Sequence, residues 1–340
     1  MVPYIVRRLL IAIPVLLAIT ILGFTALKLT PGDPLLTRVN PEVLVRLTDE
    51  QLALWRSELG LDQPIPIQYV RWLGLDPLIA IFTGDPEPVT GVLQGDLGYS
   101  IVTKRAIVDE MGPRIVPTLW LMLTAFTIAL IIGVFVGVVS AVRQYSRTDY
   151  ALTGMSVLLA STPPFVLGLV AIYFFAVNLR IMPTGGVEPL SGATWFGDYI
   201  YHLIMPALIL GLLNAAIIAR YTRSSMLDVL GSDYMTTARA KGLLNRHVIV
   251  RHGLRNGLIP VITLVGLLIP QAVAGAVITE QVFNWPGMGK LAVRAANDRD
   301  PSLMMGIILL VGTAVIIGSL VADIGYAIAD PRVRYDSKRR

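Results

Sequence analysis

The chain has 340 residues, of which 54% are hydrophobic and 15% are charged, and its mean hydropathy of +0.68 lies outside the usual range of soluble domains. We therefore expect an integral membrane protein. The formal net charge of +5 could suggest a nucleic-acid partner, but the distribution of basic residues described below fits membrane topology better. The sequence contains no cysteine, which excludes disulfides, thiolate metal sites and a lipoprotein anchor.

The first apolar run follows Arg7 and Arg8, as in a signal peptide. It continues to about Leu27, which is too long for the apolar part of a signal peptide, and no small-residue cleavage site follows it. We predict an uncleaved membrane span. Further runs of roughly 20 apolar residues predict an all-helical protein with several spans. The six predicted spans are residues 9–27, 119–142, 151–177, 203–219, 258–277 and 304–328.

Basic residues gather in the connections after the second and fourth predicted spans and in the C-terminal tail. The connection after the fourth span holds seven Lys or Arg against two acids. By the positive-inside rule, both termini and these two connections face the cytoplasm. The predicted organisation is an N-terminal span (1–29), a large external segment (30–117), a five-helix core (118–328) with a cytoplasmic loop (220–257), and a cytoplasmic tail (329–340).

The external segment contains turn signals and one predicted helix. The prolines around Gly32-Asp33 make a rigid turn, and Thr48 or Asp49 can cap a helix that ends before Gly60. The stretches 60–64, 68–69 and 95–100 carry further turn residues. Taken alone, these features indicate structure rather than function.

Small and polar residues inside the spans are candidates for close packing or for a pathway. Gly133 and Gly137 form a small-xxx-small pair, which is either a helix contact or a chance spacing. Two prolines in the third span break the helix, either as a simple kink or as the lining of a water-filled path. Polar residues of the fifth span can line the path or bond between helices. The pathway candidates are Ser161, Thr162, Pro163, Pro164, Thr263 and Gln271.

The polar, basic stretch 232–260 lies between two apolar spans. Ser232 can cap a helix over residues 233–241, and Gly242 can end it in a left-handed turn. Tyr234, Met235 and Ala238 fall on one face, which we expect to dock into a groove of another protein, with the charges on its rim. A second helix over residues 245–258 returns the chain to the membrane.

The spacing Thr236-Thr237-Ala238, three residues, then Gly242 resembles the "EAA…G" loop of permease subunits in binding-protein-dependent ABC importers. Thr stands here for the Glu and first Ala of that pattern, and His252-Gly253-Leu254-Arg255 replaces its Ile-x-Leu-Pro. These departures resemble the peptide and nickel branch. The resemblance implies a coupling helix that docks on an ATPase subunit. Its predicted residues are Asp233, Tyr234, Met235, Thr236, Thr237, Ala238, Arg239, Ala240, Lys241 and Gly242.

The resemblance extends from about Tyr4 to Arg334, with a seeming insertion between Leu73 and Val92. It implies the six-helix MetI-like fold of type I ABC importers and transport of di- or oligopeptides by alternating access. The implied partners are a second permease, two ATP-binding subunits, an external substrate-binding protein and membrane lipid, with ATP and Mg²⁺ bound by the ATPase subunits. A nickel, metal-chelate or other small-solute importer and an ion-coupled carrier stay as alternatives.

Motifs for chemistry on this chain are missing. The three histidines have no metal-binding spacing. Gly287-Met288-Gly289-Lys290 lacks the upstream glycine of a phosphate loop, and Leu291 stands where Ser or Thr would bind magnesium. No catalytic, cofactor or metal site is therefore expected here, and no nucleic-acid partner. The sparse charge within the spans gives little support to an ion-coupled carrier.

Overall fold

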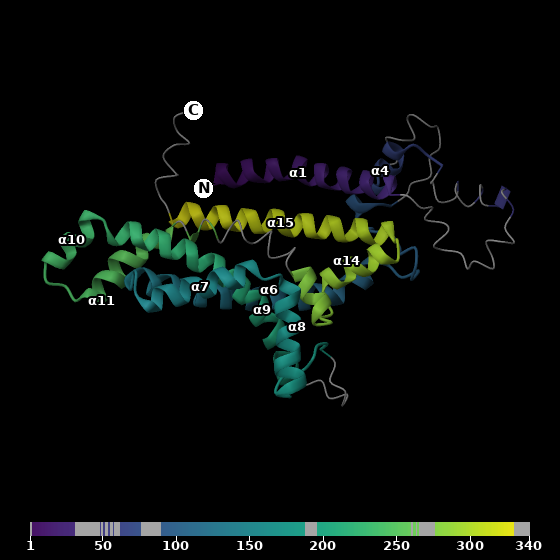
Figure 1. Cartoon of the computed structure of the whole chain (residues 1–340). Coiled ribbons are helices and arrows are strands. Elements are labelled where there is room, and N and C mark those ends of the chain that lie inside the picture. Colours follow the sequence, from purple (N-terminus) through teal and green to yellow (C-terminus); the bar gives the residue numbers. More distant parts are fainter. Residues whose placement is uncertain are drawn as a thin grey trace. The chain divides into compact units, whose positions relative to one another are not determined.

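A computed structural model describes residues 2–30, 62–75, 90–187, 196–259 and 276–329, with single positions between 48 and 57 and between 261 and 264. The chain forms two compact units, Met1–Arg114 with Leu291–Ala314, and Ile115–Lys290 with Val315–Arg340. Figure 1 shows that the described part is built from helices. Its one β-bridge joins Tyr99 and Ala106. The turn at Pro31, most of the helix predicted before Gly60, most of the insertion before Val92, and both Thr263 and Gln271 lie outside the described residues.

Four helices of the described residues are long and apolar enough to cross a membrane. These spans are Val6–Leu29, Ile107–Val142, Gly197–Leu230 and Pro301–Val321, and they coincide with the first, second, fourth and sixth predicted spans. They belong to α1 (Val2–Leu29), α6 (Ile107–Val142), α9 (Phe196–Leu230) and α15 (Pro301–Ala329). At 36 and 35 residues, α6 and α9 extend well beyond their apolar runs. Most of the fifth predicted span lies outside the described residues.

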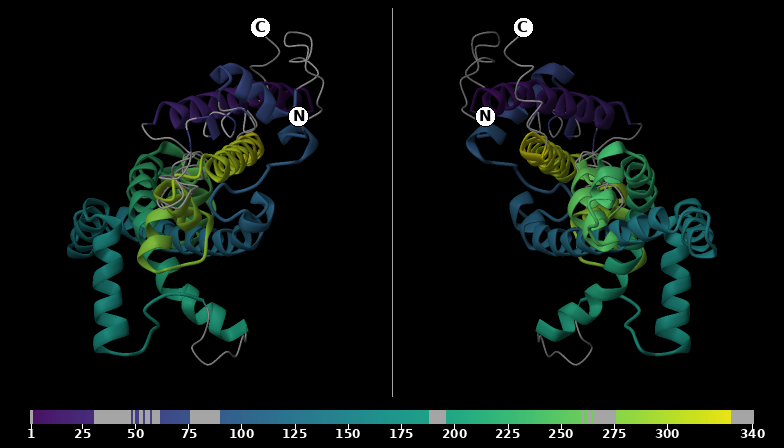
Figure 2. Two further views of the ribbon diagram at one scale, coloured as in Figure 1. Left: turned by 90° about the vertical axis from the view of Figure 1, so that its right-hand side faces the viewer. Right: turned by 90° about the vertical axis from the view of Figure 1, so that its left-hand side faces the viewer.

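The third predicted span is not one straight helix. It consists of α7 (Arg147–Ser161), α8 (Pro164–Ala171) and a π-helical end, η2 (Ile172–Asn178). The two halves are bent by 104°, as the teal helices in Figure 2 show. Thr162 is extended, with ψ of 129°, because a residue before proline avoids the helical region. Pro163 and Pro164 lack N–H groups, so the chain turns sharply here and restarts a helix at Pro164.

Aromatic and polar contacts organise the first unit. Phe24 of α1 packs against Tyr69 of α4 (Ile65–Leu73), with ring centroids 5.5 Å apart, and the Tyr69 hydroxyl lies 2.8 Å from Oγ1 of Thr20. The short helix η1 (Val92–Gln94) is tied to the end of α4 because Gln94 Nε2 donates to the Gly74 carbonyl at 2.8 Å. The described parts of the predicted external segment therefore contact both α1 and one another.

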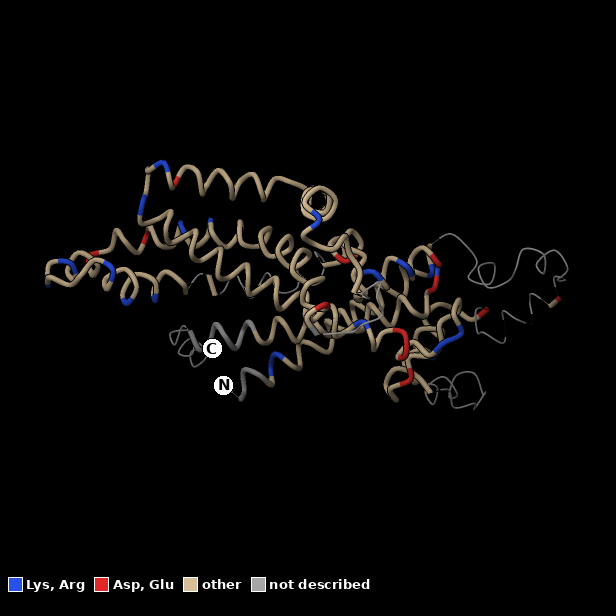
Figure 3. The backbone as a smooth tube through the Cα atoms, turned by 90° about the horizontal axis from the view of Figure 1, so that it is seen from below, with Lys and Arg blue, Asp and Glu red and all other residues tan. Residues whose placement is uncertain are grey.

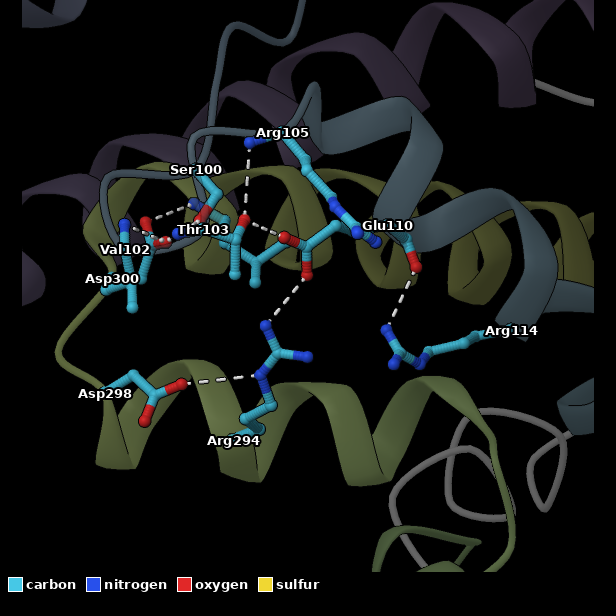
Figure 4. A network of polar contacts seen from close by, with 10 residues as sticks. Ser100, Val102, Thr103, Arg105, Glu110, Arg114, Arg294, Asp298 and Asp300 are labelled. Carbon is cyan, nitrogen blue, oxygen red and sulfur yellow. Dashed lines mark hydrogen bonds and ion pairs between the residues drawn. The ribbon is translucent and has the colours of Figure 1, made fainter.

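A polar network in the same unit joins the start of α6 to α14 (Met288–Asn297) and to the start of α15 (Figure 4). Arg294 pairs with Glu110 at 3.1 Å and with Asp298 at 3.4 Å. Asp300 accepts a 2.5 Å hydrogen bond from the Ser100 hydroxyl. These contacts explain how acidic residues between apolar helices are accommodated.

The loop before α6 holds a separate charged group, Asp96. Its carboxylate accepts hydrogen bonds from the Thr90 hydroxyl at 2.7 Å and from the Gly98 N–H at 2.8 Å. These bonds hold the pKa of Asp96 below its ordinary value because they favour the charged form. Asp96 therefore fixes this turn as a carboxylate.

The small residues of α6 make a dedicated contact with α9 in the second unit. A Cβ at Gly137 would lie 2.5 Å from Cβ of Thr222 and 2.7 Å from the Ala219 carbonyl. A Cβ at Gly133 would lie 2.7 Å from Cβ of Ile218. Both distances are shorter than real Cβ contacts allow, so the two backbones approach each other this closely only with glycine at these positions.

Candidate functional site

The polar loop after α9 contains the short helix α10 (Asp233–Ala240), which confirms the helix predicted there. Ser232 occupies the residue before the helix with extended dihedrals, but its hydroxyl donates to the Val229 carbonyl at 2.6 Å and makes no capping bond. The predicted side-chain cap is therefore wrong, because Ser232 satisfies a carbonyl at the end of α9 instead. Gly242 has φ of +76° and ends the helix in the predicted left-handed turn.

One face of α10 is buried within the chain itself. Met235 is 0% exposed and Ala238 is 8% exposed, and both pack with Val248 against the end of α9. A Cβ at Gly253 would lie 3.3 Å from Cε of Met235, so the returning chain passes closely over this side chain. The prediction that Met235 and Ala238 dock into another protein is wrong. An amphipathic stripe needs an apolar cover, and here the returning segment supplies it.

The returning segment is helical, as predicted for residues 245–258, but contains a wide turn. It consists of α11 (Asn245–His247), the π-helix η3 (Val248–Leu254) and α12 (Arg255–Gly257). Its end is fixed to α9, because Ser225 Oγ donates to the Gly257 carbonyl at 2.8 Å. A Cβ at Gly257 would also lie 2.5 Å from Sδ of the buried Met226. The loop is therefore held firmly on the last turns of α9.

The rest of α10 and the turn after it are exposed. Tyr234 lies beside the buried stripe, and its hydroxyl accepts a 3.3 Å hydrogen bond from Asn256 Nδ2 of the returning segment. Tyr234 is 43% exposed, Leu243 42% and Leu244 81%, in a loop outside the apolar helices. Thr237, Ala240 and Lys241 are exposed beside them. Figure 3 shows basic positions recurring along this loop. The exposed basic residues are Arg239, Lys241, Arg246, Arg251 and Arg255. Exposed apolar and basic side chains therefore lie side by side on this surface.

A buried ion pair lies where α9 approaches this loop. Arg223 donates from Nε and Nη2 to the two carboxylate oxygens of Asp149, each at 2.8 Å. Asp149 is 2% exposed in its side chain, and Arg223 is 27% exposed. The carboxylate also accepts hydrogen bonds from Ser140 of α6, from Thr153 at 3.2 Å and from the Tyr145 N–H at 3.0 Å. One carboxylate therefore joins α6, α7 and α9.

A second buried carboxylate organises the stretch Asn284–Gly289. Glu280 is 0% exposed and accepts a 2.7 Å hydrogen bond from the Thr118 hydroxyl and a 2.9 Å bond from the Lys290 N–H. Beside it, the buried Trp285 donates from Nε1 to the Pro117 carbonyl at 3.1 Å. A Cβ at Gly287 would lie 2.1 Å from Glu280 Oε1, so any side chain there would displace the Glu280 carboxylate.

The predicted pathway residues are only partly described. Ser161, Thr162, Pro163 and Pro164 together form the sharp bend between α7 and α8, with Ser161 and Pro163 exposed and the other two half-buried. The Thr162 hydroxyl donates to the Leu158 carbonyl at 2.8 Å, within its own helix.

Sequence reasoning did not find the Asp149–Arg223 pair or the Thr118–Glu280 pair. Their members are separated by 74 and 162 residues in the chain, and each single acid was visible only as an isolated charge near an apolar run. Within the described residues, no group of three or more His, Asp or Glu is arranged to hold a metal ion.

Comparisons with known proteins agree with a transport role. Residues 129–335 match the family described as binding-protein-dependent transport system inner membrane component, and residues 1–122 match the N-terminal region of these components. The oligopeptide transport system permease protein AppB of Bacillus subtilis (strain 168) is 44% identical over 336 residues, covering 98% of this chain and 100% of AppB. The glutathione transport system permease protein GsiC of Salmonella typhimurium is 38% identical over 335 residues, covering 98% of this chain and 100% of GsiC.

Among solved structures, a chain of the MetNI methionine ABC transporter in an inward-facing conformation has a similar fold. The TM-score is 0.55 at 15% sequence identity, over 66% of this chain and 98% of that chain. The fold is thus that of an ABC transporter permease, and the apolar helices agree with a multi-pass membrane protein. The chain therefore belongs to the family of inner membrane components of binding-protein-dependent transport systems.

Proposed function

We propose that this chain is one of two permease subunits of an ABC importer that carries peptides across the cytoplasmic membrane. Full-length relatives named for oligopeptides and for glutathione support a substrate with peptide bonds. The observation that carries the proposal is the loop helix α10, which is held firmly on α9 while its other face is exposed. Such a helix can receive the movement of a partner and pass it to the membrane helices.

The proposed topology has six spans with both termini in the cytoplasm. Four apolar helices and the bent pair α7–α8 supply up to five, and residues 258–277 would supply the remaining one. Residues 30–117 would then lie outside the membrane, where a substrate-binding protein delivers the peptide. Residues 220–257 would face the cytoplasm, and residues 329–340 would form the cytoplasmic tail.

The proposed docking surface for an ATPase subunit is the exposed part of residues 233–244. Tyr234, Thr237, Ala240 and Leu244 would enter the partner's groove, and Lys241 would lie at its rim. Met235 and Ala238 would act indirectly, because they hold the helix on its own chain.

Energy would enter through the partners. Two ATP-binding subunits would hold ATP and Mg²⁺, while this chain and a second permease would form the path. Closure of the ATPase subunits would push both coupling loops together and shift the permeases from inward-facing to outward-facing. The linkage is between nucleotide state and permease conformation, so this chain needs a stiff contact rather than a reactive group.

The test is co-purification of the chain from its native membrane, followed by peptide uptake and ATP hydrolysis in proteoliposomes. We expect a second permease and ATP-hydrolysing subunits to accompany it. Leu244→Arg should release the ATPase subunits, because it places a charge on the most exposed apolar residue of the docking surface. Gln144→Arg, which adds the same charge at an exposed position of another turn, should not. A chain that purifies alone, or equal behaviour of both variants, would contradict the proposal.

A further inference from the structure

Asp149 joins three helices through one carboxylate. Oδ1 accepts from Arg223 Nε, from Thr153 and from Ser140, and Oδ2 accepts from Arg223 Nη2 and the Tyr145 N–H. A carboxylate has about four lone-pair sites, so its capacity is fully used. The pairing with Arg223 is bidentate, which fixes the relative orientation of the two side chains as well as their distance.

The surroundings show that this pair is built into the helix packing. Asp149 is 2% exposed, and a small cavity beside the pair is lined by polar and apolar residues of α6, α7 and α9. The lining includes Gly137, Ser140, Ser156 and Ala219. Such an ion pair is weak evidence of a stabilising role, because apolar residues of similar volume often stabilise the packing equally well.

The pair also lies between the loop after α9 and the bend between α7 and α8. Arg223 lies a few residues before Ser225 and Met226, and these two residues hold the returning segment of the loop. Asp149 lies in the first turn of α7, and α7 ends at the 104° bend after Ser161. A helix is stiff along its axis, so a displacement of the end of α9 reaches the first turn of α7 through this ion pair and then the bend.

We propose that Asp149 and Arg223 are positioning residues that transmit movement of the coupling loop from α9 to α7 and to the bend at residues 161–164. This inference rests on the proposed function, since it assumes that an ATPase partner moves the loop. The alternative is that the pair only stabilises the fold. A structural role predicts that variants lose assembled protein, while those molecules that assemble transport normally for each ATP hydrolysed.

The experiment measures peptide uptake and ATP hydrolysis together, in proteoliposomes that contain the whole complex. For Asp149→Asn, we expect ATP hydrolysis within about twofold of wild type and at least a tenfold loss of uptake per ATP. Ser156→Ala is the matched control, because Ser156 is also buried on α7 and lines the same cavity, but its hydroxyl donates to the Leu152 carbonyl of its own helix and not to Asp149. Ser156→Ala should keep the wild-type amount of uptake per ATP hydrolysed.

A second readout follows α7 directly. The sequence has no cysteine, so Leu158→Cys, an exposed position one turn before the bend, takes a single spin label when the partner subunits are cysteine-free. We expect trapping of the nucleotide to change the mobility of the label in the wild-type and Ser156→Ala backgrounds. In the Asp149→Asn background the change should disappear.

A further variant keeps the inference testable if Asp149→Asn does not assemble. The double variant Asp149→Leu and Arg223→Leu leaves no unpaired buried charge, so it should assemble and show the same loss of uptake per ATP. Normal uptake per ATP and a normal label response in either variant would overturn the inference alone. A wild-type complex with no ATP-dependent uptake would instead overturn the proposed function.

Discussion

Gly242 gives a quantitative test of how the loop after α9 (residues 231–257) is held. Its φ of +76° lies in the left-handed region, and a Cβ placed there would meet nothing within 4 Å. Substitution by alanine therefore changes only the backbone energy, by roughly 1–2 kcal/mol. A destabilisation of this size raises the population of the opened loop by a factor of about 5–30.

The assay is limited digestion of the purified chain with trypsin, because the exposed loop carries several basic cleavage sites. Cleavage after Arg246 is the informative signal, since this bond is not adjacent to the substituted residue. When opening and reclosing are fast, the cleavage rate follows the population of the opened form. We expect Gly242→Ala to accelerate this cleavage about 5–30-fold. ATP-driven uptake should fall as well, because the exposed face of α10 loses its fixed orientation.

Gly231→Ala is the matched control on the other side of α10. Gly231 has no left-handed φ, and its nearest neighbour for a Cβ is the Leu227 carbonyl at an ordinary 3.6 Å. The same substitution should therefore be neutral or stabilise slightly. Gly242→Asn should lie close to wild type, because asparagine tolerates left-handed dihedrals better than alanine does. Equal cleavage rates for Gly231→Ala and Gly242→Ala would refute the reasoning.

Two further substitutions test the close contacts of the second unit by thermal unfolding in detergent. Gly137→Ala should lower the free energy of unfolding by about 1–3 kcal/mol, because its Cβ would lie 2.5 Å from Cβ of Thr222. Gly154→Ala on α7, where a Cβ would meet nothing within 4 Å, should raise the free energy of unfolding by about 0.5–1 kcal/mol. Gly287→Ala should lower the free energy of unfolding by about 1–3 kcal/mol, because the new methyl group displaces the Glu280 carboxylate. Adding Glu280→Asp to the same chain should restore part of this stability. Additive effects of the last two changes would contradict a direct contact.

Local sequence signals predicted the loop well. The polar break between apolar runs, the glycine after residue 241 and the periodic apolar residues placed α10 and the returning helix close to their observed bounds. The Gly133 and Gly137 pair left a close helix contact and a chance spacing open, and the structure shows the contact, with α9 as the partner. In each case, the determinant is a backbone conformation or spacing within a few residues, which the sequence displays directly.

What could not be predicted depends on residues far apart in the chain. The stripe containing Met235 and Ala238 shows that something covers it, but its pattern is the same whether the cover is another protein or residues 245–257. The two prolines after Thr162 predict a break, whereas the angle of 104° follows from what each half packs against. An isolated acid such as Asp149 does not reveal its partner 74 residues away.

The proposed path of movement from the loop through α9 to α7 includes two contacts of different physical character. The contact between Met226 and Gly257 is apolar and close, so it resists compression but has no preferred direction. The two hydrogen bonds from Arg223 to Asp149 are directional, so they resist rotation and separation of the helices. A loop pressed toward the membrane would push on α9 through the first contact, and a loop drawn away would pull on α9 through the hydrogen bond from Ser225 to Gly257. The second contact would pass either movement from α9 to α7. Movement in either direction would then reach α7, as a cycle of alternating access requires.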